Sequence, residues 1–136
     1  MFSPCQLSTV NCELLFVYGT LRQGFRAESL MRHAGGRYLG KACVRGRLFN
    51  VGEFPGAVKA PGAPRRVLGE LYCLPGAVRA LKFLDRYEGS RYKREVTEVE
   101  LQSGRRVRAW IYWLKRVPVS RPKIEGGDYT RTRSEL

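Results

Sequence analysis

The sequence has little of what metal centres and membrane spans are built from. Among its 136 residues there is one histidine, His33, and the four cysteines show no CxxC spacing, which argues against a zinc site. No apolar run approaches the roughly 18 residues that a membrane-spanning helix needs. Residues 1–13 carry no lysine or arginine, so they lack the charged start of a signal peptide. We therefore expect a cytoplasmic protein without a metal or a membrane span.

The cysteines are also too scattered to predict a disulfide framework. Cys43 and Cys73 lie inside apolar, strand-like runs, where a thiol is usually a small core residue. Cys5 and Cys12 are close enough in sequence to pair in an oxidising setting, but nothing else in the sequence favours that pairing.

Acidic residues are scarce relative to basic ones. The chain has 25 lysines and arginines against 12 aspartates and glutamates, a formal net charge of +13. Such an excess raises the possibility of nucleic-acid binding, which depends mainly on phosphate contacts. The basic residues run evenly from Arg22 to Arg133, however, without a block of five or six. A generally arginine-rich composition explains that dispersal equally well, so both interpretations stay open.

The length and composition predict a single domain over residues 1–136, with residues 1–12 as a loose lead-in. An apolar share of 43% and an aromatic share of 11% are typical of a globular protein. Strand-like runs cover residues 14–18 and 67–74, residues 37–52 suit a bent or bulged pair of strands, and residues 53–66 are loop-rich.

The second half of the chain has the clearest elements. The sequence predicts a helix over residues 75–89, because a proline stands near the start, apolar residues recur at helical spacing and Gly89 follows just past the end. Residues 92–101 and 107–114 are strand-like and flank a hairpin turn, while residues 26–36 suit a short helix ended by two glycines. Because strands predominate without a regular βαβ alternation, the expected fold is α+β: a small, partly closed mixed sheet with helices packed outside.

The late helix places a carboxylate at the edge of its apolar face. Leu81 and Glu88 are seven positions apart, about 700° of helical rotation, so they lie on nearly the same side as Leu84. Burial there would raise the pKa of Glu88 and suit it to proton transfer near neutral pH. The alternative is that the helix frays at Gly89 and Glu88 reaches solvent. Asp85, one turn earlier, is expected to be a surface or capping group.

The stretch VYGTLRQG interrupts the first core strand. After Tyr18, the pair Gly19-Thr20 breaks an apolar run, and glycine allows a ligand to approach the main chain closely. Successive N–H groups at such a break can form an anion-binding nest. An ordinary turn after a strand explains the glycine as well, and the local residues alone do not decide between the two.

Taken together, the two stretches resemble a known family. FVYGTLRQG is followed about 65 residues later by LDRYEG, and this pair is similar to motifs of the gamma-glutamylcyclotransferase-like family. The resemblance covers roughly Leu14 to Tyr129 and includes FPGAV, VLGELYCL, YKREVTEVEL, AWIYWL and IEGGDYTR. It implies a small mixed-sheet barrel flanked by helices, which agrees with the fold expected above.

The resemblance also implies a reaction and a site. The free α-amine of a γ-glutamyl compound attacks its own γ-carbonyl, which gives 5-oxoproline and releases an amine or amino acid, with no cofactor. By motif position Glu88 would be the general acid and base, and Tyr18, Gly19, Thr20 and Leu21 would cradle the γ-glutamyl group.

Several further residues are weaker candidates for the site. Tyr92 and Tyr129 would either line the pocket or pack in the core or at the rim. Pro55 would shape the loop that faces the Tyr18–Leu21 cradle. Arg22 would either bind a substrate carboxylate or lie on the surface. His33 precedes two glycines at a helix end, an ordinary position for a histidine. Many relatives carry an Asn-His pair where this chain has Ala27-Glu28, so the sequence does not identify the leaving group.

Three functions remain to be distinguished. The first is a γ-glutamyl cyclotransferase acting on a small-molecule substrate. The second is a non-catalytic binding module of the same fold that acts through its basic surface on RNA or an acidic partner, and the third is a relative that binds a small acid without turnover. The sequence does not give the oligomeric state.

Overall fold

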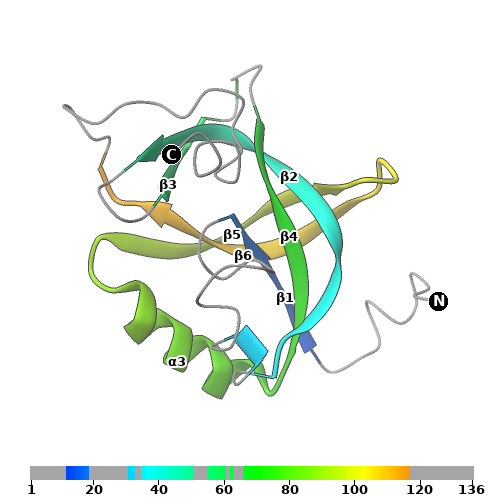
Figure 1. Cartoon of the computed structure of the whole chain (residues 1–136), viewed down its shortest axis with the longest axis vertical. Coiled ribbons are helices and arrows are strands. Elements are labelled where there is room, and N and C mark those ends of the chain that lie inside the picture. The colour runs from blue at the N-terminus through cyan, green and yellow to red at the C-terminus, as the bar shows by residue number, and fades with distance from the viewer. Residues whose placement is uncertain are drawn as a thin grey trace, which may run out of the picture.

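The computed structural model describes residues 12–18, 31–32, 35–50, 55–60, 62 and 66–116. Within them, one six-stranded sheet curves around a core and one long helix packs beside it (Figure 1). In chain order the elements are β1 (Cys12–Val17), β2 (Arg37–Asn50), β3 (Pro55–Lys59), β4 (Arg66–Pro75), α3 (Ala77–Glu88), β5 (Tyr92–Leu101) and β6 (Arg106–Leu114).

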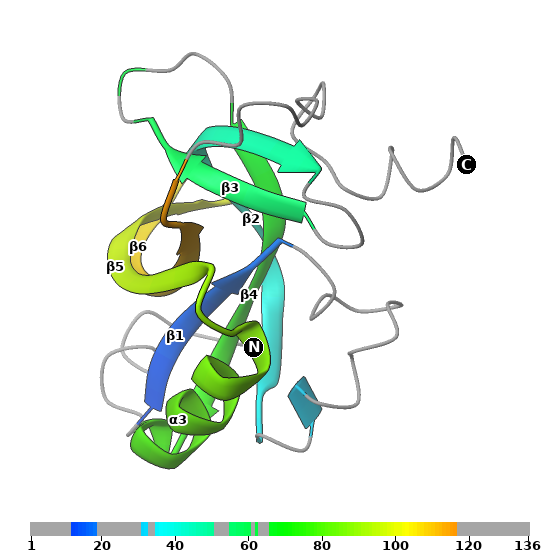
Figure 2. The same cartoon turned by 90° about the vertical axis from the view of Figure 1, so that its left-hand side faces the viewer.

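The sheet closes on itself as a mixed barrel. Its order is β1-β4-β2-β3-β6-β5, and β1 also pairs with β6, which completes a ring (Figure 2). The β1–β6 and β3–β6 contacts are parallel, at Leu15–Trp110 and Ala57–Trp113, whereas the other pairings are antiparallel. The expected α+β fold with a small mixed-sheet barrel is confirmed, and closure is complete rather than partial.

Strand β2 is the long curved element that connects the two sides of the barrel. It pairs with β4 along its first part and with β3 along its last part. The register shifts between Tyr38 and Gly40, and Gly40 has a φ of 144° that a side chain would disfavour. The expected bend and bulge are therefore present, but residues 37–50 form one strand rather than a pair.

One expected loop contains a strand. Residues 53–66 were predicted to be loop-rich, yet Pro55–Lys59 forms β3. The proline is compatible with a strand because it stands at the first position, where a missing N–H interrupts little of the ladder. Ala57 is fully buried, so tertiary packing overrides the local turn signals.

The buried side chains form two clusters on opposite faces of the sheet. Along β1 and the residue that follows it, Phe16 and Tyr18 belong to the cluster inside the barrel, whereas Leu15 and Val17 belong to the cluster beside α3, as the two-residue period of an extended chain requires. The interior cluster also contains Val44, Leu48, Ala57, Val67, Leu71, Val99, Ala109, Ile111 and Trp113, and the helix-side cluster contains Met31, Tyr72, Leu74, Ala80, Leu81, Leu84 and Tyr112.

The late helix is confirmed with slightly different limits. Helix α3 begins after Gly76, which has a φ of 63°, so Pro75 ends β4 rather than starting the helix. Leu81 and Leu84 are buried against the sheet, as the spacing predicts. The helix ends at Glu88, because Gly89 adopts a φ of 84° and turns the chain toward β5.

The early helix is described only at its end. Met31 and Arg32 are helical, and the N–H groups of Gly35 and Gly36 donate to the carbonyls of Arg32 and Met31, both at 3.0 Å. The two glycines thus end the helix as predicted, while the rest of residues 26–36 lies outside the described residues. In the part of the chain that the structure describes, no helix is long and apolar enough to cross a membrane.

The two described cysteine side chains differ from each other. Cys73 is fully buried, as expected of a core residue, but it is disulfide-bonded rather than a free thiol. Cys43 is a free thiol and only partly buried. The disulfide is a correction to the sequence-based interpretation of Cys73, which took it for a small core thiol.

Candidate active site

Glu88 stands at the last position of α3, where the chain turns into β5. The N–H of Gly89 donates to the carbonyl of Asp85 at 3.1 Å, which completes the final turn of the helix. The N–H of Tyr92 then donates to the carbonyl of Gly89 at 3.5 Å as the strand starts. Backbone contacts on both sides of Glu88 therefore fix its main chain, in contrast to the frayed helix end that was the alternative.

The carboxyl group of Glu88 lies in a desolvated environment. The residue is only partly exposed, and burial raises the pKa of its carboxyl from 4.5 to about 7. Its negative charge in turn contributes to raising the pKa of the Tyr18 and Tyr112 phenols, after the larger effect of their own burial. The expected rise in the pKa of Glu88 is confirmed, and its charge acts on Tyr18 at the end of β1.

Tyr18 is buried inside the barrel and its hydroxyl joins two strands. It donates to the carbonyl of Tyr112 at 2.5 Å and accepts from the N–H of Ala57 at 3.0 Å. Burial first, and then the neighbouring Tyr92, raise the pKa of this phenol. The hydroxyl therefore stays protonated at neutral pH and is a fixed structural group between β3 and β6.

The structure describes only the start of the predicted break in the first strand. The ladder between β1 and β4 ends at the pair Val17–Glu70, and Tyr18 has already left the strand. The predicted cradle residues Gly19, Thr20 and Leu21 lie outside the described residues, as do Arg22, His33 and Tyr129. The anion-binding nest stays a prediction.

Tyr92 is the other predicted site residue whose position is described. It begins β5 four residues after Glu88, is partly buried and packs against the helix-side cluster. After burial, its electrostatic effect is the next largest cause of the raised pKa of the Tyr18 phenol. Of the six predicted site residues, the structure describes Glu88, Tyr18 and Tyr92, and both Glu88 and Tyr92 contribute to raising the pKa of the Tyr18 phenol. Pro55 lies on β3, whose Ala57 binds the Tyr18 hydroxyl.

Asp85 differs from its expected role as a surface or capping group. Its side chain is 40% exposed, but it accepts hydrogen bonds from Arg94 at 2.8 and 3.1 Å and from the Tyr112 hydroxyl at 2.6 Å. Partial burial acts to raise the pKa of this carboxyl, yet the bonds from Arg94 and Tyr112 outweigh it and lower the pKa. Asp85 is therefore held ionised beside Glu88.

Two further polar groups were not found from the sequence. Glu70 is a buried carboxylate on β4, 6% exposed, opposite the last residue of β1. Its only sequence signal is a single acidic residue in the apolar run VLGELYCL. Trp113 is buried in the barrel, and its indole N–H has no hydrogen-bond partner in the structure as far as it is described. Such an orphaned donor often marks a place for water or a ligand.

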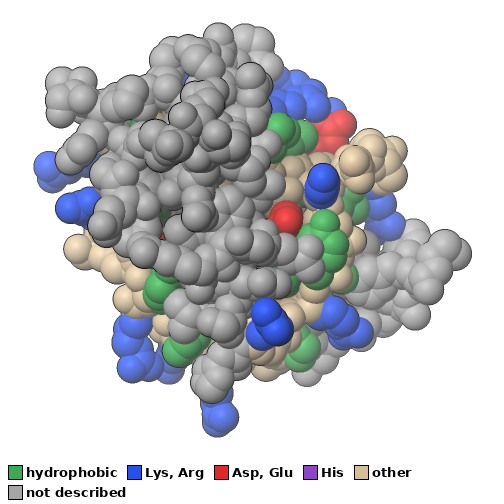
Figure 3. All heavy atoms as spheres, in the orientation of Figure 1, with side chains coloured by type: hydrophobic (Ala, Val, Ile, Leu, Met, Phe, Trp, Pro, Cys, Tyr) green, Lys and Arg blue, Asp and Glu red, His purple; other side chains and the backbone are tan. Residues whose placement is uncertain are grey.

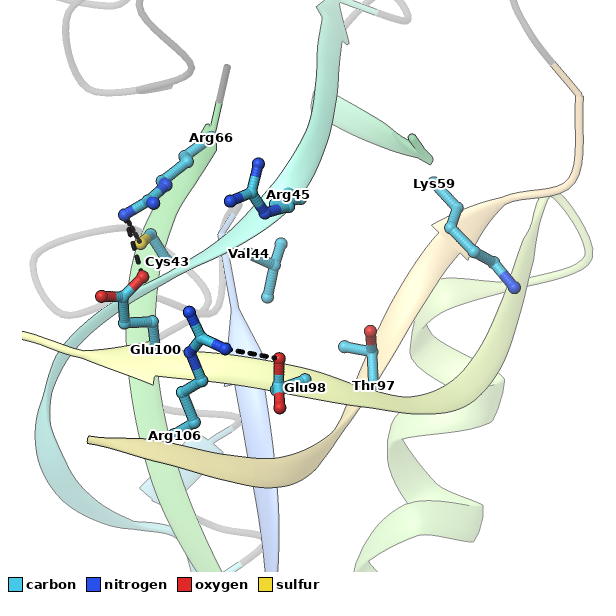
Figure 4. A pocket seen from close by; sticks show the side chains of 9 residues that line it. All are labelled: Cys43, Val44, Arg45, Lys59, Arg66, Thr97, Glu98, Glu100 and Arg106. Carbon is cyan, nitrogen blue, oxygen red and sulfur yellow. Dashed lines mark hydrogen bonds and ion pairs between the residues drawn. The ribbon is translucent and has the colours of Figure 1, made fainter. Parts of the chain in front are cut away.

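A separate cleft of about 340 Å³ opens where β2 and β5 diverge beyond the pair Cys43–Glu100 (Figure 4). Its lining includes Arg45, Lys59, Arg66 and Arg106. Carboxylates of β5 form ion pairs with three of these cations: Glu95 with Lys59 at 2.6 Å, Glu100 with Arg66 at 2.9 Å and Glu98 with Arg106 at 3.7 Å. Neither Glu88, Tyr18 nor Tyr92 lines this cleft, so the carboxyl group whose pKa is best placed for proton transfer lies elsewhere.

The excess positive charge is dispersed over the surface. On the face shown in Figure 3, lysine and arginine side chains are spread around the visible part of the molecule rather than gathered in one patch. This agrees with their even distribution along the sequence. In the described ranges, no group of three or more histidine, cysteine, aspartate or glutamate side chains could hold a metal ion.

Comparisons with known proteins agree with the resemblance of the motifs. A family model described as gamma-glutamyl cyclotransferase, AIG2-like, matches residues 15–131. A protein of Methanocaldococcus jannaschii named "Putative gamma-glutamylcyclotransferase MJ1514" is 30% identical over 122 residues, which are 86% of this chain and 95% of that one.

Solved structures of similar proteins share the fold. An AIG2-like protein from Mus musculus is 26% identical, with a TM-score of 0.74 over 87% of this chain and 89% of its own. YkqA from Bacillus subtilis is 27% identical, also with a TM-score of 0.74, and the match covers 91% of this chain but 42% of that longer protein. With the family model spanning most of the chain and the barrel in agreement, this protein belongs to the gamma-glutamyl cyclotransferase, AIG2-like family.

Proposed function

We propose that this protein is an enzyme that releases 5-oxoproline from a γ-glutamyl amine or a γ-glutamyl amino acid. Membership of the family supports a gamma-glutamylcyclotransferase-like function in general. The single observation that carries the finer proposal is the environment of Glu88, a partly buried carboxyl at the end of α3 with a pKa of about 7, whose charge contributes to raising the pKa of Tyr18.

The reaction is an internal displacement. The α-amine of the substrate forms a C–N bond to the γ-carbonyl carbon, and the bond from that carbon to the departing nitrogen breaks. The attacking ammonium must lose protons and the leaving nitrogen must gain one. A carboxyl with a pKa near the ambient pH suits both transfers, because it is present in comparable amounts as acid and as base. Glu88 is the group in this role.

Asp85 is unsuited to that role, although it lies in the same turn. Its hydrogen bonds from Arg94 and Tyr112 lower its pKa and occupy its oxygens. It therefore remains a carboxylate at neutral pH and has no proton to return to the leaving group. The two acids differ in environment rather than in type, which is how one helix turn supplies a proton carrier and a fixed charge.

The substrate would lie between Glu88 and the chain that follows β1. Backbone groups from Tyr18 to Leu21 would hold the γ-glutamyl portion, and Tyr92 would form a wall of the pocket. Because the nucleophile and the electrophile are parts of one molecule, holding the substrate folded supplies a large effective concentration. One proton carrier and a polar cradle then suffice, and the reaction as written requires no cofactor.

The test measures 5-oxoproline released from a panel of γ-glutamyl amines, γ-glutamyl amino acids and γ-glutamyl peptides. We expect turnover of at least one member by the wild type and a loss of about 100-fold or more in Glu88→Gln, since general acid–base catalysis contributes about that much. The matched control is Glu98→Gln, which changes an exposed glutamate of β5. Equal activity of wild type and Glu88→Gln, or no 5-oxoproline from any substrate, would contradict the proposal.

Binding of RNA or an acidic partner through the basic surface stays a prediction from the net charge. No described observation favours it, because three of the four cations that line the cleft of Figure 4 have carboxylate partners on β5.

A further inference from the structure

The position of a carboxyl group at the last residue of a helix depends on the contacts that fix the last helical turn. In α3 the side chain three residues before Glu88 is Asp85, so the two project from nearby positions on the helix surface. Asp85 is bonded to side chains of two strands, β5 and β6. The turn that carries Glu88 is therefore attached to the sheet through its neighbour.

The contact with β5 is rigid in geometry. Arg94 reaches Asp85 with two donors, Nε to Oδ1 at 2.8 Å and Nη2 to Oδ2 at 3.1 Å. Such a two-point pairing fixes orientation as well as distance. The guanidinium also lies 4.4 Å from the centre of the Trp110 ring, whose indole N–H donates to Glu13 at 2.7 Å. Arg94 is thus held from both sides.

The contact with β6 continues to the end of β1. The Tyr112 hydroxyl donates to Asp85 Oδ1 at 2.6 Å, and the carbonyl of the same Tyr112 accepts from the Tyr18 hydroxyl at 2.5 Å. A continuous path therefore runs from the turn of Glu88, through Asp85 and Tyr112, to Tyr18. The two ends of this path are the two parts of the proposed active site.

We propose that Asp85 is a positioning residue, which acts through Arg94 and Tyr112 to fix Glu88 relative to Tyr18 at the end of β1. The inference rests on the proposed function for its effect on turnover. A purely stabilising role is the competing explanation, but a partly exposed ion pair contributes little to stability. A loss of activity far larger than any loss of stability would therefore separate the two.

The experiment uses two variants of the full chain, one that removes a charge and one that removes a hydrogen-bond donor. Asp85→Asn keeps the shape but removes the charge that pairs with Arg94. Tyr112→Phe removes one hydroxyl and leaves every charge unchanged, so it excludes a simple electrostatic effect on Glu88. Glu100→Gln is the matched control, because it weakens the Arg66–Glu100 pair in the cleft of Figure 4, which has similar exposure.

The first readout does not depend on turnover. This readout is the pKa of the Glu88 carboxyl, followed by ¹³C NMR titration, which we expect to be about 7 in the wild type because burial raises it. In both variants we expect it to fall toward 4.5, because a loosened last turn lets water reach the carboxyl. In Glu100→Gln it should stay at the wild-type value. An unchanged Glu88 pKa in Asp85→Asn and Tyr112→Phe would overturn the proposal.

The second readout is steady-state kinetics with a substrate that the wild type turns over. We expect kcat to fall by about 10- to 100-fold with a smaller change in KM, as a misplacement of about 1 Å does, while the melting temperature falls by only a few degrees. A fall in kcat no larger than that of Glu100→Gln would also overturn the proposal. If the wild type turns over nothing, the proposed function fails, and the NMR titration alone decides the positioning role.

Discussion

Replacing Glu88 by glutamine should make the protein more stable at neutral and alkaline pH. The carboxyl group is partly buried and its pKa in the folded chain is about 7, against an ordinary value of 4.5. The folded protein therefore holds the proton of Glu88 more tightly than the unfolded chain does. Ionising Glu88 costs folding free energy, and glutamine, which has nearly the same shape, does not ionise.

The size of the effect follows from the two pKa values. A tenfold change in proton affinity corresponds to about 1.4 kcal/mol, so a rise in pKa from 4.5 to about 7 amounts to about 3.5 kcal/mol at most. Below pH 4.5 the group is protonated in both states and there is no cost. As the pH rises from 4.5 through 7, the free energy of unfolding of the wild type falls relative to that of Glu88→Gln. Above about pH 8 the difference between the two proteins reaches its full value.

Urea denaturation of both proteins at a series of pH values from 4 to 8.5 measures this difference, with the free energy of unfolding obtained by linear extrapolation. Other titrating groups are common to both proteins and cancel in the subtraction. The control, Glu98→Gln, removes a carboxylate with 63% exposure, so its difference from wild type should vary little with pH. A difference for Glu88→Gln that is equally flat from pH 4 to 8.5 would refute the inference that Glu88 is desolvated.

Two further predictions concern the end of β1 and its contacts with neighbouring strands. Tyr18→Phe should destabilise the fold by about 1–3 kcal/mol in urea denaturation, because it leaves the Ala57 N–H and the Tyr112 carbonyl without their bridging hydroxyl; an unchanged midpoint would show that water replaces the hydroxyl. Gly69→Ala should destabilise by about 1–3 kcal/mol or more, because the added Cβ would overlap the Val17 carbonyl and lie 2.7 Å from Phe16 Cζ. Gly62→Ala, where a Cβ meets nothing within 4 Å, is its control, and equal stability of these two variants would contradict the packing argument.

Local patterns in the sequence predict much of the fold and one part of the site. The glycines after Arg32 and Glu88 end helices where they were expected, because a positive φ suits glycine regardless of the rest of the protein. The strand alternation and the seven-residue spacing from Leu81 to Glu88 are likewise local. They predicted the burial and the raised pKa of Glu88 without knowledge of its neighbours.

What the sequence did not predict depends on contacts between distant segments. Strand β3 begins at a proline and is rich in loop-forming residues, and only its packing between β2 and β6 makes it a strand. Glu70 lies in an apolar run, and its burial follows from its place opposite the end of β1. No local rule gives either result, since the partners come from other parts of the chain.

The two acids of the last helical turn show the same limit most clearly. Asp85 and Glu88 are three residues apart in LDRYEG. Helix geometry predicted the burial of Glu88 and a surface or capping position for Asp85, and the resemblance of the motif added the acid–base role of Glu88. Their pKa values move in opposite directions because Arg94 and Tyr112 reach Asp85 but not Glu88. Arg94 is nine residues and Tyr112 is 27 residues away from Asp85 in sequence, on separate strands. The difference between the two acids therefore depends on barrel closure, which brings side chains of two strands against Asp85, while burial alone raises the pKa of Glu88.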